Sequence, residues 1–336
     1  MAEENRLRTE EEKYREKLEA LQNKRRNRFR ILVCIDGSDE GYLGLKYAAR
    51  MGGQRPDCDI ILLYVRPIDQ GLHSGGLQVR IARENMLSWG LELPGIRRLK
   101  TGLELLVGDE ELKKEWEVET TNTIVDGDPL GDNKIEYRHS SGRTVVLKLK
   151  VAPDAASGIL DQYELGPYNL IITGSAKQGR GRLRATLTPS VSEKVAYHAP
   201  CSVLLVRNLV PGKGHLVCID GSDFSTQIVL QEAELAARFP DPKVSAICVS
   251  PDAEGMSKAE KIVVEASHML KRELNFELKE TYVEVGDPVE KIIEVGKNYS
   301  AIVLGDSGKG TMNRILGGGV STDVLRLAYN SVMIMR

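Results

Sequence analysis

The chain has 336 residues, of which 41% are hydrophobic and 28% charged, and this composition is typical of a soluble globular protein and excludes a wholly disordered one. Its length predicts about two domains, and its formal net charge of -2 argues against nucleic acid as the main partner. Because no apolar stretch approaches the roughly 18 residues of a membrane span, we do not expect a membrane as a partner either.

Residues 1–30 are highly charged and form a segment of their own. Tyr14, Leu18 and Leu21 fall near one stripe, which predicts a helix over residues 1–30 that packs on the body of the protein or on a second chain. A coiled-coil contact in a homodimer, and contact of the basic residues 24–30 with nucleic acid or lipid, are the alternatives. Such a charged start is not a signal peptide, so we expect a cytoplasmic protein with reduced cysteines.

An internal repeat divides the chain into two copies of one domain. The segment LVCIDGSD occurs at residues 32–39 and again, letter for letter, at residues 216–223. Two further pairs follow in the same order, YNLIITG with YSAIVLG and SVLLVR with SVMIMR. We therefore predict a first domain over residues 31–207, a linker rich in proline and glycine over residues 208–214, and a second domain over residues 215–336.

Each copy alternates apolar runs with helical patterns. The runs are RILVCID, DIILLYVRP, YNLIITG and SVLLVR in the first copy, and HLVCID, KVSAICVSP, YSAIVLG and SVMIMR in the second. Continuous apolar runs are typical of strands that are buried on both faces, whereas GYLGLKYAARMG and STQIVLQEAELAARF have the apolar stripe of a helix. This alternation predicts an α/β fold with two tandem, doubly wound and mainly parallel sheets.

The first copy is longer than the second, and its extra residues fall mostly at about 72–150. WEVETTNTIV, KIEY and RTVVLKLKV are β-like in this region, and the SSG between the last two is typical of a hairpin turn. We therefore predict a β-hairpin inserted into the first domain.

Ligands of an open parallel sheet bind beyond the carboxyl ends of its strands, where the strand order reverses. In the second copy Asp220 follows the first strand, and a glycine-rich stretch begins at Gly305 after a later strand. Glycine lets backbone N–H groups approach a phosphate closely, and a carboxylate accepts hydrogen bonds from an adenine amino group or a ribose hydroxyl. The alternatives are a helix cap and turn at residues 220–223 and a glycine-rich loop that binds nothing.

The repeat resembles the universal stress protein family, and its second copy carries the pattern of that family's nucleotide-binding members. The pattern is glycine, two residues, glycine, nine residues, glycine, then serine or threonine, and Gly305, Gly308 and Gly318 match its spacing. The next position is Gly319, so one phosphate-binding hydroxyl of the family is absent. Val320 and Ser321 match the family at the next two positions.

The resemblance also assigns the nucleoside end of the site. Asp220 matches the aspartate that contacts the nucleoside, and Val249 lies where the family's second strand offers its backbone to adenine. The resemblance implies ATP or AMP as the ligand, with Mg²⁺ as an optional companion. It further implies five-stranded, mainly parallel sheets and an intramolecular pseudo-dimer, with the last strand of each domain near the domain contact.

The first copy departs from this pattern. Asp36 and Gly174 are kept, but Lys177 occupies the second glycine position and Pro189 the third. Because proline has no N–H to offer a phosphate, we expect the first domain to be degenerate as a nucleotide site.

No group of residues stands out as catalytic or as a metal site, and the five histidines are scattered. We therefore expect a stress-response or signalling protein that binds an adenine nucleotide in its second domain. Two alternatives stay open: a scaffold of the same family that binds no nucleotide, and an enzyme that hydrolyses ATP slowly. In the last case Asp306 and Lys309 are the nearby polar candidates.

Overall fold

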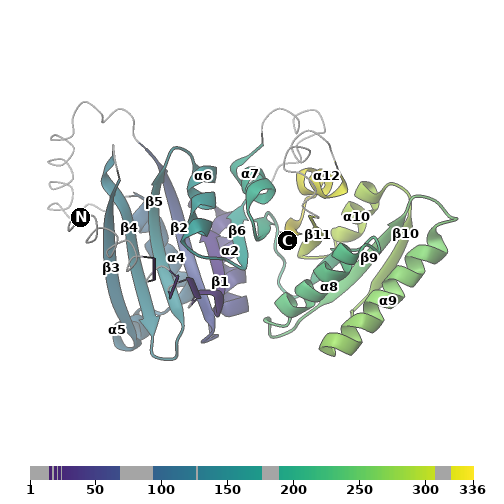
Figure 1. Cartoon of the computed structure of the whole chain (residues 1–336), viewed down its shortest axis with the longest axis horizontal. Helices are drawn as coiled ribbons and strands as arrows, with labels where there is room; N and C mark the ends of the chain where they lie inside the picture. The colour runs from purple at the N-terminus through teal and green to yellow at the C-terminus, as the bar shows by residue number, and fades with distance from the viewer. Residues whose placement is uncertain are drawn as a thin grey trace, which may run out of the picture.

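The computed structural model describes residues 15–16, 19–20, 22–23, 25–68, 94–125, 128–175, 189–306 and 319–336. Within these residues, twelve strands form one sheet that runs through both copies (Figure 1). In chain order the strands are β1 (Phe29–Cys34), β2 (Cys58–Pro67), β3 (Trp116–Val125), β4 (Asp128–His139), β5 (Thr144–Ala152), β6 (Leu170–Gly174), β7 (Ser202–Val206), β8 (His215–Cys218), β9 (Val244–Ser250), β10 (Thr281–Val285), β11 (Ala301–Gly305) and β12 (Ser331–Met335).

Each copy contributes five parallel strands in the same order. The first domain has β5-β2-β1-β6-β7 and the second has β10-β9-β8-β11-β12. The first strand of each copy lies in the middle, and the chain winds outward to one side and then to the other. This doubly wound arrangement confirms the predicted α/β fold.

One parallel strand of each domain was not predicted from an apolar run. It is β5 in the first domain and β10 in the second. β10 lies at the edge of the sheet and all its side chains are at least partly exposed, so it has no apolar run. Sequence reasoning places β5 in the inserted hairpin, but β5 pairs in parallel with β2, from Asp59↔Thr144 to Pro67↔Ala152. The sequence pattern of a hairpin identifies the two strands joined by its turn. It does not identify the strand that pairs with the outer edge of either one. The hairpin partner of β5 is β4, and β3 extends the sheet beyond it.

Two layers of helices cover the sheet. One face packs against α2 (Asp39–Gly52), α4 (Pro94–Leu106), α8 (Asp223–Ala236) and α9 (Met256–Leu274). The other face packs against α6 (Ala155–Leu160), α7 (Val191–His198), α10 (Pro288–Gly296) and α12 (Val320–Leu327). The remaining elements are α5 (Asp109–Glu115) and the 3₁₀ helix η2 (Asp161–Leu165). Among the described helices, none is long and apolar enough to cross a membrane.

The predicted helix over residues 1–30 ends earlier than expected. β1 already begins at Phe29, because the N–H of Phe29 donates to the carbonyl of Asp57 and joins the strand to the sheet. Before β1, the described residues 15–16, 19–20, 22–23 and 25–26 are helical. The rest of this predicted helix lies outside the described residues.

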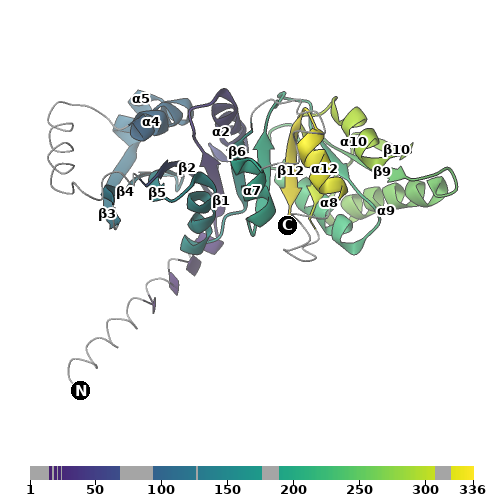
Figure 2. The same ribbon diagram turned by 90° about the horizontal axis from the view of Figure 1, so that it is seen from above.

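The two five-stranded sets meet at β7 and β12, the last strand of each domain. These strands pair antiparallel, with Val332 opposite Leu205 and Ile334 opposite Val203. The C-terminus therefore lies near the middle of the molecule, beside α7 and α12 (Figure 2). The resemblance placed the last strands at this domain contact.

Two arginines tie the junction together in a reciprocal way. Arg207 follows β7, and its guanidinium donates to the carbonyls of Leu325 (2.5 Å) and Ala328 (2.7 Å) at the end of α12. Arg336 follows β12, and its guanidinium donates to the carbonyl of Ala196 in α7. Each domain thus caps the C-terminal end of a helix in the other, where carbonyl groups lack partners within the helix.

Candidate functional site

The turn after β8 is shaped by Asp220 and Ser222. Gly221 has a φ of 79°, which favours glycine, and Ser222 is the N-cap of α8. Asp220 Oδ1 accepts hydrogen bonds from Ser222 N (3.0 Å) and Ser222 Oγ (2.6 Å). Partial burial raises the pKa of Asp220, but hydrogen bonds from Ser222 and Ser225 outweigh it and hold the pKa below its usual value. Asp220 is thus an ionised carboxylate that also shapes a cap.

A cavity of about 320 Å³ lies at the carboxyl ends of β8, β9 and β11, where the strand order reverses. Its wall contains five of the eight residues that the sequence nominates, which are Asp220, Val249, Gly305, Val320 and Ser321. Gly319 immediately precedes Val320 as the N-cap of α12. Gly308 and Gly318 lie outside the described residues. The structure therefore brings the nominated strand ends and the start of α12 to one cleft.

Gly305 has a packing role that the sequence pattern does not reveal. A Cβ at this position would lie 2.8 Å from Cε1 of Phe224 and 3.0 Å from Cγ1 of Ile228, both on α8. Glycine therefore lets α8 approach the end of β11. Ser321 Oγ donates to the carbonyl of Gly305 (3.1 Å), which ties the start of α12 to the same strand end.

The N-terminus of α12 is open, whereas that of its counterpart α7 is closed by side chains. Ser190 caps α7: its Oγ accepts from Glu193 N (3.3 Å), and Glu193 Oε2 accepts from Ser190 N (2.7 Å). Gly319 occupies the same place before α12 and makes no side-chain cap. Among the described residues, the first N–H groups of α12 thus lack the side-chain cap that α7 has.

The first domain has a matching cleft of about 310 Å³ that contains Asp36. Asp36 Oδ1 accepts from Ser38 N (2.9 Å) and Ser38 Oγ (2.5 Å), as Asp220 does from Ser222. Here, however, Arg98 of α4 lines the cleft, and a Cβ on Gly37 would lie only 2.6 Å from its Nε. The guanidinium of Arg98 also lies over the ring of Tyr64, 5.4 Å from its centre. The first cleft therefore contains a cation of its own beside the aspartate turn.

Comparison with known proteins supplies the family. The model of the universal stress protein family matches residues 27–207 and again residues 215–336. The chain belongs to the universal stress protein family. A search of curated proteins found no match.

Two solved structures are similar in fold to most of this chain. A universal stress protein from Archaeoglobus fulgidus is 19% identical, covers 91% of this chain and 96% of its own, and has a TM-score of 0.52. One described as a putative universal stress protein from Pseudomonas aeruginosa is 16% identical, covers 95% and 94%, and has a TM-score of 0.54. At these identities the likeness shows the fold alone.

Sequence reasoning missed the apolar wall of the cleft in this universal stress protein. Phe224 of α8 and Pro288 and Ile292 of α10 line it. The available signal was Asp287 followed by Pro288, because an N-cap aspartate and a proline at the first helical position together mark a helix start. With that signal, α10 would have been placed beyond β10.

The polar candidates of the hydrolysis hypothesis lie elsewhere or outside the described residues. Asp306 is held in an ion pair with Arg336 (2.7 Å) and does not line the cavity, and Lys309 is not described. In the described part of the chain, no group of three or more His, Cys, Asp or Glu side chains is arranged to hold a metal ion.

Proposed function

We propose that this universal stress protein binds one adenine nucleotide per chain in the second-domain cleft and acts in stress response or signalling. The observation that carries the proposal is the pairing of a carboxylate with an open helix N-terminus in one cavity. Asp220 provides an acceptor at one side, and the start of α12, after Gly319, provides N–H donors at the other. A cavity of about 320 Å³ is within the size range of small-molecule sites.

The charges of the cleft favour one orientation of the nucleotide. The ionised Asp220 repels phosphates and accepts from the ribose or the adenine amino group. The N-terminus of α12 carries a partial positive charge that attracts phosphates. We therefore propose that the nucleoside lies near Asp220 and Val249 and that the phosphates lie near Gly319 and Ser321. ATP, with Mg²⁺ on its phosphates, is the proposed ligand, and AMP is the alternative.

Two features support restricting the nucleotide to the second domain. The capping box of Ser190 and Glu193 already satisfies the start of α7, and Pro189 before it has no N–H. In addition, Arg98 occupies the side of the first cleft next to Asp36. Neither feature occurs among the residues described at the second cleft.

Replacing Asp220 by asparagine is expected to weaken the binding of ATP and of adenosine by a similar factor of about ten. The reason is that a hydrogen bond to a charged group becomes a weaker neutral one, a loss of about 1.4 kcal/mol. Asp36→Asn is the matched control, because it makes the same change in the same kind of turn and is expected to leave both affinities unaltered. Calorimetric titration of ATP and of adenosine into both variants and the unaltered protein measures the six affinities.

Three results of this titration, and one of a separate phosphate-release assay, would contradict the proposal. If Asp36→Asn weakened nucleotide binding and Asp220→Asn did not, the site would lie in the first domain. A loss of ATP affinity with unchanged adenosine affinity would place Asp220 at the phosphates. The absence of any binding by the unaltered protein would favour a scaffold, and phosphate release over hours would favour a slow ATPase.

Gly319→Ser is expected to strengthen ATP binding about fivefold and adenosine binding little. The backbone at Gly319 is extended, with a φ of -141°, and no atom of the described residues lies within 4 Å of an added Cβ, so serine fits there without strain. Its hydroxyl would donate to a phosphate, which after exchange with water is worth about 1 kcal/mol. An equal gain for adenosine, or a loss for both, would show that position 319 does not face the phosphates.

A further inference from the structure

A third cavity, of about 470 Å³, lies in the first domain at the amino ends of β1, β2 and β5, away from the Asp36 cleft at the carboxyl ends of β1 and β2. Seven arginine and lysine side chains line it, against two carboxylates, Asp59 and Glu136. β4 contributes one wall with Lys134, Glu136 and Arg138. The cavity thus depends on a strand that the second domain lacks among its described residues.

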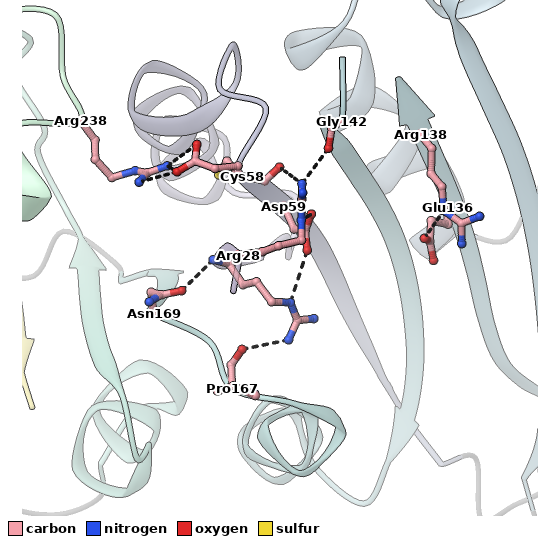
Figure 3. Close-up of polar contacts among 11 residues, drawn as sticks. Arg28, Cys58, Asp59, Glu136, Arg138, Gly142, Pro167, Asn169 and Arg238 are labelled. Carbon is pink, nitrogen blue, oxygen red and sulfur yellow. Dashed lines mark hydrogen bonds and ion pairs between the residues drawn. The ribbon is translucent and has the colours of Figure 1, made fainter. Parts of the chain in front are cut away.

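Asp59 is shared between two arginines. Its Oδ1 accepts from Arg28 Nε (2.6 Å), and its Oδ2 lies 3.6 Å from Arg30 Nε. Arg28 also donates to the carbonyls of Cys58 and Gly142 (Figure 3). The guanidinium of Arg30 lies over the ring of Tyr168, 4.4 Å from its centre. One carboxylate therefore serves two guanidinium groups on this side.

The same sharing occurs on β4. Glu136 pairs with Arg138 (2.7 Å) and with Lys134 (Figure 3 shows the Glu136–Arg138 pair). Carboxylates outside the cavity also take part, since Glu119 is a second partner of Arg138 (3.0 Å) and Glu111 pairs with Arg143 (2.7 Å). Each acidic group is thus engaged, and positive charge remains in excess along the wall.

Lys148 is the lysine most affected by this excess of positive charge. Its Nζ donates to Oε1 of Gln162 (2.6 Å), a neutral amide that is only 1% exposed. Burial, and then the positive charges of Arg25, Lys134 and Arg30, lower the pKa of Lys148 to about 7. The fold therefore holds an ammonium group among like charges, which an anion in the cavity would relieve.

The equivalent position in the second domain has different chemistry. Leu63 of β2 and Ile247 of β9 correspond, because each lies opposite the cysteine of the LVCIDGSD repeat. Lys148 lies opposite Leu63 and Tyr282 lies opposite Ile247, so Lys148 and Tyr282 are counterparts. The Tyr282 hydroxyl bonds to Glu280 and to the hydroxyl of Tyr299 (3.0 Å). The cationic cavity is thus a property of the first domain and not of the repeat.

We propose that this cavity binds a small molecule that carries several phosphate groups. The volume of the cavity suits a small molecule, and guanidinium groups from residues 25–30 and from β4 suit phosphates, which they bind through paired N–H donors. Ile61, Val146 and Tyr168 give the cavity an apolar part for the body of the ligand. This proposal does not depend on nucleotide binding in the second domain.

Titration of the full chain with inorganic tripolyphosphate tests the proposal. Lys148→Met is expected to weaken binding at least tenfold, because it removes a charged donor from the cavity. Lys150→Met is the matched control: Lys150 lies two residues further along β5, pairs with Asp132 (2.8 Å) and does not line the cavity. We expect it to change the affinity less than threefold. Adenosine binding, measured on the same variants, should stay constant.

The pH dependence of binding gives a second readout. An anion favours charged Lys148, so affinity is expected to fall as the pH rises above about 7, by up to about tenfold per unit. The groups that act on Lys148 are Arg25, Arg30 and Lys134, which lower its pKa, and Asp132, which raises it. Arginine stays charged throughout this range, so the Lys148→Arg variant should retain binding. Its affinity should change with pH only as far as the ligand itself gains or loses protons.

Two outcomes would overturn the proposal. One is that the unaltered protein and the Lys148→Met variant bind tripolyphosphate equally well, or that neither binds it. The variant counts as folded in this comparison if its melting temperature is unchanged or higher. The other is a single-stranded oligonucleotide that displaces tripolyphosphate and loses its binding in Lys148→Met. That result would assign the basic wall to nucleic acid instead.

Discussion

Replacing His215 by leucine is expected to lower the free energy of unfolding by about 3–5 kcal/mol. Glu232 of α8 is 0% exposed, and one of its carboxylate oxygens bonds to Nδ1 of His215. Nε2 of His215 contacts the hydroxyl of Tyr47 (3.0 Å), which belongs to α2 of the first domain. The other oxygen of Glu232 has no hydrogen-bond partner in the described structure. Without His215, a buried carboxylate would be left uncompensated at the domain contact.

A double-mutant cycle separates the loss of the polar partner of Glu232 from a loss of packing. The pair His215→Leu and Glu232→Leu removes both polar partners, and it is expected to recover most of the lost stability, since apolar replacements of a buried pair are often neutral. Tyr47→Phe removes one hydrogen bond and is expected to cost about 1 kcal/mol. Urea unfolding followed by circular dichroism measures each value. A double variant as unstable as His215→Leu would show that packing, and not the uncompensated carboxylate, dominates.

Replacing Arg207 by methionine is expected to cost about 3 kcal/mol. The side chain of Arg207 is buried and donates to two carbonyls at the end of α12, while its backbone N–H donates to Ser331 Oγ (3.1 Å). Methionine fills a similar space but leaves the carbonyls of Leu325 and Ala328 buried without these donors. The cost arises from the desolvated carbonyls and not from a lost charge pair, because the guanidinium hydrogen bonds described for Arg207 go to these carbonyls.

Arg207→Lys provides the control for charge. Lysine keeps the positive charge but, as a single ammonium group, it does not reproduce the planar fork that reaches both carbonyls, so an intermediate loss of about 1–2 kcal/mol is expected. Urea unfolding of both variants, with hydrogen exchange at the end of α12, measures the effect. A loss below 1 kcal/mol for Arg207→Met, with unchanged exchange in α12, would show that water replaces the guanidinium.

The arrangement of the candidate site was accessible from sequence because the site lies at strand ends. A buried parallel strand appears as an apolar run, so the residue just beyond it is placed at the carboxyl edge of the sheet. This reasoning brought Asp220 and Gly305 together, the family resemblance added Val249, and the structure places all three on one cavity. The packing of Gly305 against Phe224 was not accessible in this way, because it depends on how closely a helix crosses the sheet.

The amino-acid sequence by itself determined the two tandem α/β domains, because a repeated order of apolar runs and helical stripes specifies a repeated fold. Only the tertiary structure decided which strands are neighbours: β10 is too exposed to form an apolar run, and β5 pairs on two sides at once. The structure alone also placed Arg98 beside Asp36 and gathered Arg28, Asp59 and Lys148 around one cavity. The residues of each group are far apart in the chain. Only strand pairing and helix packing bring their side chains together, and no local sequence pattern encodes those contacts.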